Sequence, residues 1–303
     1  MSGNGENGTN LRPEYTEEVV FSARPDALRI RATLRAMFRG FVRSPYLAYR
    51  LVVRDVKANY SKSVLGIFWD LADQLVLGLI FYVLMRNRVI SAGQMDVPYA
   101  VFVIYGLMIY ATFCQALMMS IDLIKNSKGL LNQMRVPPEA LLESVFFRVL
   151  FDSMFRIAAM LLFSLLLWSA AESRGLHSFS LPGFCAFLAL YPLFILCGMS
   201  VGLFLAPFNV VFSDVGRTAK LVLTPLRYVT PVLWPIPATG LAFSIIDRIN
   251  PLTPMIEGLR ALATSGSFPD WQWALAWGVA YAVFFLVGWF IFHVSVPILA
   301  ERA

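Results

Sequence analysis

The chain has 303 residues, of which 58% are hydrophobic and 15% are charged, and its formal net charge at pH 7 is +6. Soluble domains carry about 25% charged residues, so this composition excludes an ordinary soluble globular domain and indicates that lipid covers much of the surface. The basic excess lies mostly before the first long apolar run, which points to an anionic membrane surface and against a nucleic-acid partner.

The N-terminal region is polar and basic. Residues 1–27 contain no apolar segment and are predicted to be a flexible polar tail. Residues 28–63 hold two segments in which apolar side chains and cations recur at helical spacing on different faces, and the second segment carries Arg50, Arg54 and Lys57 on one face. Such basic amphipathic helices lie in the headgroup plane with their cations toward anionic lipid. A soluble helical domain packed on itself is the alternative.

Six apolar stretches follow that are long enough, or nearly so, to cross about 30 Å of hydrocarbon, which needs roughly 20 helical residues. They are predicted at 64–85, 99–121, 145–171, 183–206, 219–235 and 273–299. The fifth stretch is the shortest and contains Pro225 and Pro231. Between the fifth and sixth stretches, 242–249 and 254–263 are semi-apolar but too short to span, so a re-entrant pair of helices is predicted there.

These patterns predict an all-α membrane protein with three parts: a tail at 1–27, interfacial helices at 28–63, and a six-helix transmembrane domain at 64–303. Lys and Arg residues concentrate in the N-terminal region and in the loops that contain Lys125 and Arg217. Since cytoplasmic loops are enriched in these cations, both termini are predicted to be cytoplasmic, with His177 and Pro251 outside.

Signatures of catalysis are absent from the sequence. The two histidines and three cysteines fit no metal-ligand spacing, and the cysteines, which all lie in apolar runs, are predicted to be buried free thiols. No GxxxxGK[ST] loop occurs, so the chain itself is not expected to bind ATP in this way. We therefore predict that the chain is not an enzyme and carries no cofactor of its own.

Charged residues inside the predicted spans are costly in lipid and mark candidate sites. Arg148, Asp152 and Arg156 follow one another at four-residue intervals and share one helix face. They form either a structural ladder of ion pairs or a site for substrate or proton handling. Arg227, in the fifth stretch, either faces a polar pathway or pairs with a carboxylate such as Asp152.

Aromatic residues form a second candidate set, because their rings can stack on the apolar faces of sugars. Ordinary packing between helices is the alternative. With Arg227, the predicted lining of a substrate pathway consists of aromatics on the first, second and fifth stretches: Phe68, Trp69, Tyr82, Tyr105, Tyr110, Tyr228 and Trp234.

Four segments resemble one family of membrane transporters. They are RDVKANYSKSVLGIFW at 54–69, RVPPEALLES at 135–144, NVVFSDVGRTAKLVLTPLRYVTPVLWP at 209–235, and NPLTPMIEGLR at 250–260. In this order and on this topology they are similar to ABC-2 type permeases that export polysaccharides and polyol phosphates, such as O-antigen, teichoic-acid and capsule exporters. The resemblance covers roughly Arg50 to Leu299. Asp70 and Asp73 depart from it, because such exporters usually have apolar residues or proline there.

The resemblance implies a homodimeric permease in the bacterial inner membrane that works with two copies of a separate ABC ATPase, which binds ATP and magnesium. It implies a lipid-linked glycan as cargo, a pathway between the two protomers, and a cytoplasmic entrance at Arg50, Arg54 and Lys57. The ATPase is expected to dock on the loop that contains Lys125, Lys128, Arg135, Val136, Pro137 and Pro138. Two alternatives stay open: an ABC-2 exporter of a small amphiphile or drug, and a secondary transporter or channel without an ATPase.

Overall fold

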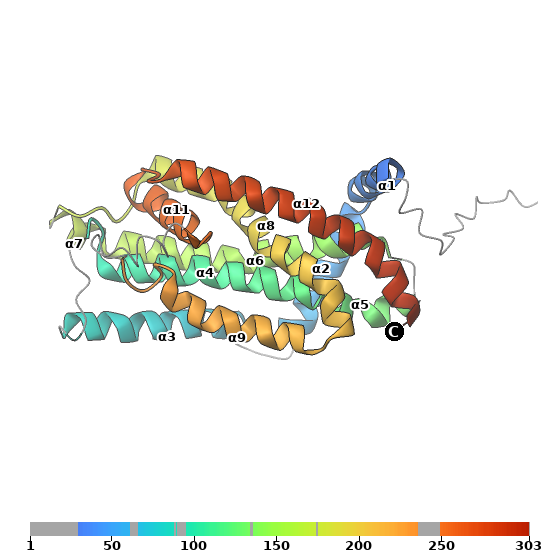
Figure 1. Ribbon diagram of the computed structural model, residues 1–303. Coiled ribbons are helices and arrows are strands. Elements are labelled where there is room, and N and C mark those ends of the chain that lie inside the picture. The colour runs from blue at the N-terminus through green and yellow to red at the C-terminus, as the bar shows by residue number, and fades with distance from the viewer. Residues whose placement is uncertain are drawn as a thin grey trace, which may run out of the picture.

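The computed structural model describes residues 30–60, 66–87, 89, 95–133, 136–173, 175–235 and 249–302. Within these ranges every regular element is a helix, which confirms the predicted all-α class. Figure 1 shows the long helices side by side in an elongated bundle, with α7 and α11 at one end and α1, α5 and the C-terminus at the other.

The two predicted amphipathic segments are helices α1 (Ile30–Arg43) and α2 (Pro45–Tyr60). Pro45 opens α2 at its first position, where a missing N–H does no harm, and the chain turns at the buried Ser44. In α1, Met37 is buried, and the ring of Phe38 packs edge-on against Trp289 with 5.6 Å between centroids. Helix α1 therefore docks on the bundle through a hydrophobic contact.

Six helices occupy the predicted apolar stretches: α3 (Gly66–Arg86), α4 (Tyr99–Ile121), α6 (Pro138–Leu166), α8 (Leu181–Val211), α9 (Asp214–Val229) and α12 (Trp271–Arg302). By length and composition, four of them could cross a membrane among the described residues, namely α4, α6, α8 and α12. Helix α9, with 16 residues, is shorter than the roughly 20 that a crossing needs. The structure therefore supports several spans, and the count of six stays a prediction.

Two predicted boundaries were wrong for reasons that proline explains. Helix α6 begins at Pro138 rather than near residue 145, because proline is well suited to the first turn of a helix. Helix α9 ends at Val229 rather than at Pro235, because Pro231 lacks an N–H and its ring clashes with the preceding turn.

Three shorter helices connect the long ones: α5 (Leu123–Gln133), α7 (Trp168–Glu172) and α11 (Thr253–Ser265). Helix α5 replaces most of a predicted loop. Helix α11 covers 254–263, where the second short helix was predicted, and its re-entrant character stays a prediction. It is followed by the capping residue Gly266, which adopts the left-handed conformation with φ of 76°. It packs against α8, α4 and α12. The first member, at 242–249, falls outside the described residues apart from Ile249.

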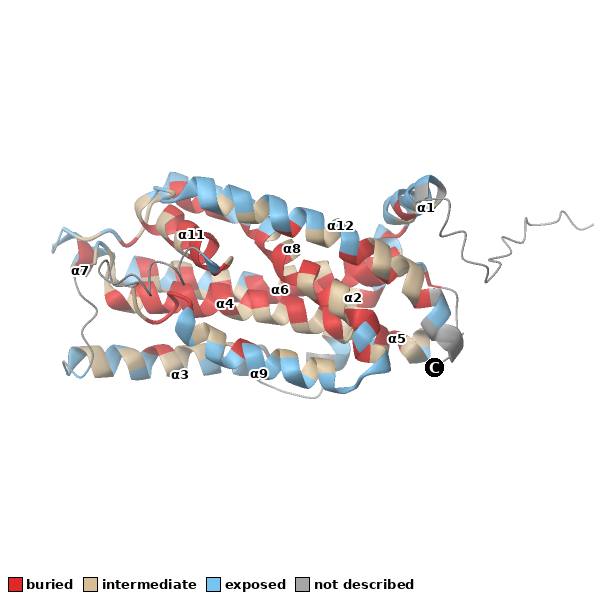
Figure 2. Ribbon diagram, viewed as in Figure 1, coloured by how far each residue is buried: buried red, intermediate tan, exposed pale blue. Residues whose placement is uncertain are grey.

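Helix α4 forms the centre of the bundle. It packs against α3, α6, α8, α9 and α11, and Figure 2 shows it buried along most of its length. Small residues allow the closest approaches: a Cβ added at Gly106 would overlap the carbonyl oxygen of Val232, and one added at Gly202 would overlap that of Leu117. The other long helices are therefore arranged around α4.

Helices α3 and α9 flank α4 and leave a broad surface uncovered (Figure 2). In α9, Leu223 is the only residue that is fully buried. We call this surface the α3–α9 face; its exposed members are Trp69, Asp73 and Val76 of α3 and Lys220, Leu221, Thr224 and Tyr228 of α9.

Candidate functional site

A polar pocket of about 480 Å³ lies between α3, α4, α6 and α9, and we call it the arginine pocket. This volume falls within the roughly 300–1,000 Å³ of small-molecule sites. Its lining residues are Trp69, Asp73, Gln74, Ala111, Cys114, Gln115, Arg156 and Arg227. The α4 residues lie near the midpoint of that helix, so the pocket is at mid-depth in the bundle.

The spacing of charges on α6 accounts for the cationic character of the pocket. Arg148 and Asp152, both buried, form an ion pair with 3.0 Å between Nε and Oδ2, and Gln115 donates to the same carboxylate oxygen at 2.6 Å. Arg156 instead donates from Nη1 to the hydroxyl of Thr112 at 3.1 Å. The predicted ladder of ion pairs therefore forms at its first step, and Arg156 contributes an additional positive charge.

Arg227 brings a second guanidinium to the pocket from the last turn of α9. Its Cζ lies 5.8 Å from the centroid of the Tyr110 ring, a cation–π geometry. Among the ion pairs of the described residues, neither Arg156 nor Arg227 has a carboxylate partner. Two guanidiniums at this depth make the pocket the strongest candidate for a functional site.

The wall of the pocket also gathers buried polar atoms that lack hydrogen-bond partners. Of nine such atoms in the described residues, four belong to this lining: Nε of Arg156, Nε of Arg227, Oε1 of Gln74 and Oε1 of Gln115. Leaving one buried polar atom without a partner costs about 1–3 kcal/mol, and more when the group is charged. A ligand or ordered water that binds in the pocket would remove this cost.

Two of the predicted pathway aromatics, Trp69 and Tyr228, lie on the α3–α9 face, whereas Tyr82 lies on another side of α3, about 140° from Trp69 around the helix axis. Trp69, Tyr82 and Tyr228 are 62%, 38% and 43% exposed. Trp234 follows α9 and lies 6.1 Å from Tyr228 and 6.3 Å from Phe81 of α3, measured between ring centroids. The side chain of Phe68 is outside the described part of the structure. The face thus presents indole and phenol rings beside the arginine pocket.

Tyr105 and Tyr110 lie elsewhere, inside the protomer. Both are fully buried, as expected for residues of the central helix α4. The hydroxyl of Tyr105 shares a hydrogen bond of 3.0 Å with that of Ser164, and the hydroxyl of Tyr110 donates to the carbonyl oxygen of Leu223 at 2.5 Å. Tyr110 therefore contacts α9 at two points, through its hydroxyl at Leu223 and through its ring at Arg227.

The predicted entrance residues lie on α2, near the end of the bundle that holds α5 and the C-terminus (Figure 1). Arg50, Arg54 and Lys57 are all exposed, and Arg54 pairs with its neighbour Asp55 at 2.8 Å. Helix α2 packs along α6. These cations are available to a charged ligand or to lipid headgroups.

The predicted coupling residues divide into buried and exposed groups. Val136 is buried, Pro137 is exposed and Pro138 opens α6, whereas Arg135 is outside the described residues. Lys128 is half-buried on α5. The exposed part of the predicted docking loop that the structure describes is therefore the turn at Pro137 and the outer side of α5.

Lys125 has a structural partner that the sequence reasoning missed. Its Nζ donates to Oδ1 of Asn209 at 3.0 Å, and Oδ1 also accepts from the backbone N–H of Gly216 at 3.1 Å. Nδ2 of Asn209 donates to the carbonyl oxygen of Ile121 at 3.1 Å and to Asp122 at 2.9 Å. Asn209 thus joins the α4–α5 turn to the α8–α9 turn. A polar amide at the end of an apolar run was the available signal.

Two buried carboxylates at the start of α6 were also missed. Oε1 of Glu139 lies 2.5 Å from Nδ1 of His293, although the sequence suggested no partner for this histidine. The hydroxyl of Ser44 donates to Glu143 at 2.7 Å. These contacts join α12 and the α1–α2 corner to α6.

Arg260 is a further charged residue that the sequence analysis did not single out. It is buried on α11, with its Cζ 3.6 Å from the centroid of the Phe102 ring. Its Nη1 donates to the carbonyl oxygen of Pro231 at 2.9 Å. Arg260 therefore fixes the segment after α9 against α4 and α11.

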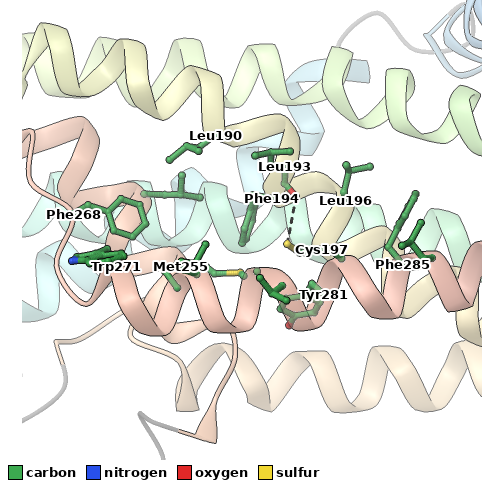
Figure 3. A pocket seen from close by; sticks show the side chains of 17 residues that line it. Leu190, Leu193, Phe194, Leu196, Cys197, Met255, Phe268, Trp271, Tyr281 and Phe285 are labelled. Atoms are coloured by element: carbon green, nitrogen blue, oxygen red, sulfur yellow. Dashed lines mark hydrogen bonds between the residues drawn. The ribbon is translucent and has the colours of Figure 1, made fainter.

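A second cavity, of about 660 Å³, lies between α8, α11 and α12 (Figure 3). Leu190, Leu193, Trp271 and Phe285 are among its lining residues, which are almost all apolar. The cavity suits a hydrocarbon chain and has no charged group to orient a polar cargo.

Among the described residues, no cluster of three or more His, Cys, Asp or Glu side chains could hold a metal ion. Cys114, Cys185 and Cys197 are free thiols, as predicted. Cys185 differs from the prediction because it is exposed on the outside of α8.

The chain matches the family model described as ABC-2 type transporter over residues 46–263. It is 22% identical over 232 residues to the polysialic acid transport protein KpsM of Escherichia coli, which covers 75% of this chain and 84% of that protein. It is 25% identical over 230 residues to the O-antigen export system permease protein RfbA of Myxococcus xanthus, with coverage of 74% and 82%. The protein with the same description in Klebsiella pneumoniae is 25% identical over 244 residues, with coverage of 73% and 83%.

Proposed function

We propose that this chain, which belongs to the ABC-2 type transporter family, is the permease subunit of an ATP-driven exporter that moves a lipid-linked polysaccharide, such as O-antigen, across the bacterial inner membrane. The chain is a transporter subunit and not an enzyme. Relatives that match most of its length are described by polysialic acid transport and O-antigen export, which supports a cell-surface glycan as the cargo.

The observation that carries the proposal is the α3–α9 face with the arginine pocket beside it. Helix α9 exposes Lys220, Thr224 and Tyr228 along its length, and α3 exposes Asp73. Covering these groups with hydrocarbon would be costly. A second protomer and a water-filled pathway offer a better environment, so we place α3 and α9 of both protomers of a homodimer around a shared axis.

In this arrangement the pathway is lined by Trp69, Arg227, Tyr228 and Trp234. A polymer must slide, so its contacts need to be weak and repeated. Aromatic rings provide such contacts, since aromatic pairs in proteins contribute about 0.5–1.5 kcal/mol each beyond area burial. Phe68 belongs to the same proposed lining.

The ATPase subunits and the cargo entrance are both assigned to the end of the bundle that holds α1, α5 and the C-terminus (Figure 1). We place this end in the cytoplasm, with two ATPase subunits, which bind ATP and magnesium, docked at Pro137 and α5. Arg50, Arg54 and Lys57 then lie at the cytoplasmic entrance. The α7–α11 end, with His177, faces outward, and α11 belongs to a re-entrant pair.

The apolar cavity of Figure 3 favours a second candidate function, export of a small amphiphile. A hydrophobic drug would fit a cavity of this kind. However, the cavity is formed by α8, α11 and α12, whereas the polar groups lie with α3 and α9. A bilayer acyl chain is an adequate occupant, so polysaccharide export is the better-supported function.

Removal of this chain from its host tests the two functions against each other. For a glycan exporter we expect the surface polysaccharide to disappear and its lipid-linked form to accumulate inside, with both effects reversed by the wild-type chain. An amphiphile exporter predicts unchanged surface polysaccharide and greater sensitivity to hydrophobic drugs. Both kinds of exporter require an ATPase subunit, so co-purification of an ATPase with the chain distinguishes them from a secondary transporter or channel.

A further inference from the structure

We infer that the arginine pocket binds an acidic sugar unit of the exported glycan, with the carboxylate held by Arg156 and Arg227 and the hydroxyls held by Gln74 and Gln115. This inference rests on the proposed function and adds to it the charge of the cargo. It concerns a site inside the protomer wall, beside the aromatic lining of the pathway.

The charges around the pocket favour a ligand with one negative charge. The carboxylate of Asp152 is already matched by Arg148. Arg156, which is only 5% exposed, and Arg227 then face one remaining lining carboxylate, that of the exposed Asp73. Among the described residues of the lining, one positive charge is left uncompensated, and a single carboxylate would neutralise it. The planar guanidinium fork suits a carboxylate well.

The partnerless atoms specify more than charge. Nε of Arg156 and Nε of Arg227 are donors, whereas Oε1 of Gln74 and Oε1 of Gln115 are acceptors. The amide of Gln115 is oriented by its donation to Asp152, which turns its oxygen away from that carboxylate. The ligand must therefore present both acceptors and donors.

Three classes of ligand can be compared on this basis. Inorganic phosphate supplies acceptors but few donors for the two glutamine oxygens. A neutral sugar supplies hydroxyl donors but no charge for the arginines. An acidic sugar supplies both, and the indole of Trp69 in the same lining offers a surface for the sugar ring. The carboxylate and hydroxyls of an acidic sugar thus supply both the acceptors and the donors that the four atoms lack.

Binding to the purified permease–ATPase complex in lipid nanodiscs tests this inference, with isothermal titration calorimetry as the readout. The probes are a trimer of N-acetylneuraminic acid, the neutral trimer maltotriose, and inorganic phosphate. We expect the acidic trimer to bind at least about tenfold more tightly than maltotriose, the effect of one charge-assisted hydrogen bond. Phosphate at equal concentration should not displace it.

Arg227→Gln is the main variant, because its guanidinium lies over the ring of Tyr110 and has no ion pair or side-chain hydrogen bond among the described residues. It should weaken binding of the acidic trimer about tenfold and leave maltotriose unchanged. Arg156→Gln should have a similar effect but also removes the contact with Thr112. Arg217→Gln is the matched control for Arg227→Gln, because both arginines lie on α9 and Arg217 is exposed and pairs with Asp214. This control should bind the acidic trimer as tightly as the wild type does.

Equal affinity for the acidic and neutral trimers, displacement by phosphate, or unchanged binding in Arg227→Gln would overturn the inference. Such a result leaves polysaccharide export standing if removal of the chain still abolishes the surface polysaccharide. Unchanged surface polysaccharide in that removal experiment would instead refute the proposed function.

Discussion

Replacement of Asn209 by alanine should both destabilise the permease and weaken its coupling to ATP hydrolysis. The buried amide makes four hydrogen bonds, two with the neutral groups of Ile121 and Gly216 and two with the charged groups of Asp122 and Lys125. These use the full capacity of an asparagine side chain. The variant would leave the α4–α5 and α8–α9 turns without their shared connection.

The size of the effect follows from these bonds. About 1 kcal/mol for each neutral bond and about 1.5 kcal/mol for each charged one give a loss of about 5 kcal/mol. Asp122 and Lys125 are half-buried, so water replaces part of their lost contacts and about 3 kcal/mol remains. For a chain of this size, that loss corresponds to a decrease in Tm on the order of 6 °C.

Thermal unfolding in detergent can be followed with a thiol-reactive dye, because Cys197 is buried and becomes reactive only on unfolding, while the exposed Cys185 gives a constant baseline. The matched control is Asn87→Ala. Asn87 is exposed and donates one hydrogen bond of 2.9 Å to the carbonyl oxygen of Val83, so its Tm should change by about 1 °C.

Coupling is measured as glycan exported per ATP hydrolysed in proteoliposomes that contain the ATPase. We expect Asn209→Ala to lower this ratio at temperatures well below its Tm. A Tm decrease no larger than that of Asn87→Ala would refute the stabilisation that we assign to the four hydrogen bonds of Asn209. A normal export ratio in a destabilised variant would show that Asn209 contributes only to stability.

Three further outcomes test the packing, the pathway and the topology. Gly106→Ala should destabilise the fold by about 1–3 kcal/mol and reduce the amount of inserted protein, because its Cβ would overlap the carbonyl oxygen of Val232. The control is Gly129→Ala, because a Cβ at Gly129 would have nothing within 4 Å. Equal yields of the two variants would contradict the close approach at Gly106. Tyr228→Leu should slow glycan export per inserted protein, since the ring is 43% exposed on the α3–α9 face, and an unchanged rate would assign the ring to packing. A cysteine introduced at the exposed His177 should react with an impermeant maleimide in intact cells; reaction only in inverted vesicles would reverse the proposed topology.

Helix positions were largely predictable because apolar runs and prolines act locally. The predicted stretch at 99–121 coincides with α4, since a helix buried along its length is apolar along its length. Helix α6 was predicted to start too late because its first turns include Glu139, Glu143 and Ser144, which lower the local hydropathy. Hydropathy measures the part of a helix that resembles hydrocarbon, and it therefore misses such extensions.

The site was only partly predictable because its chemistry depends on contacts between distant residues. A cation in an apolar run identified Arg227 and Arg156. Gln74 and Gln115 carry no charge, so their role as partnerless acceptors emerges only when four helices meet. The same applies to Glu139 and His293, which are 154 residues apart in the chain. Burial of Tyr105 and Tyr110 also depends on their neighbours, which an aromatic count does not consider.

The docking of α1 on Trp289 constrains the order in which the protein matures during synthesis. Helix α1 leaves the ribosome first, but its aromatic partner lies on α12, which is made last. During translation, Phe38 and Phe41 are therefore without their ring contacts and must wait at the membrane surface. Because α1 is amphipathic, it can bind to the membrane surface until α12 has been synthesised. The end of the bundle that holds α1 is complete only after the final helix has inserted. A nascent chain truncated before Trp289 could keep the contacts of α1 with α6 but would lack the ring contacts of Phe38 and Phe41.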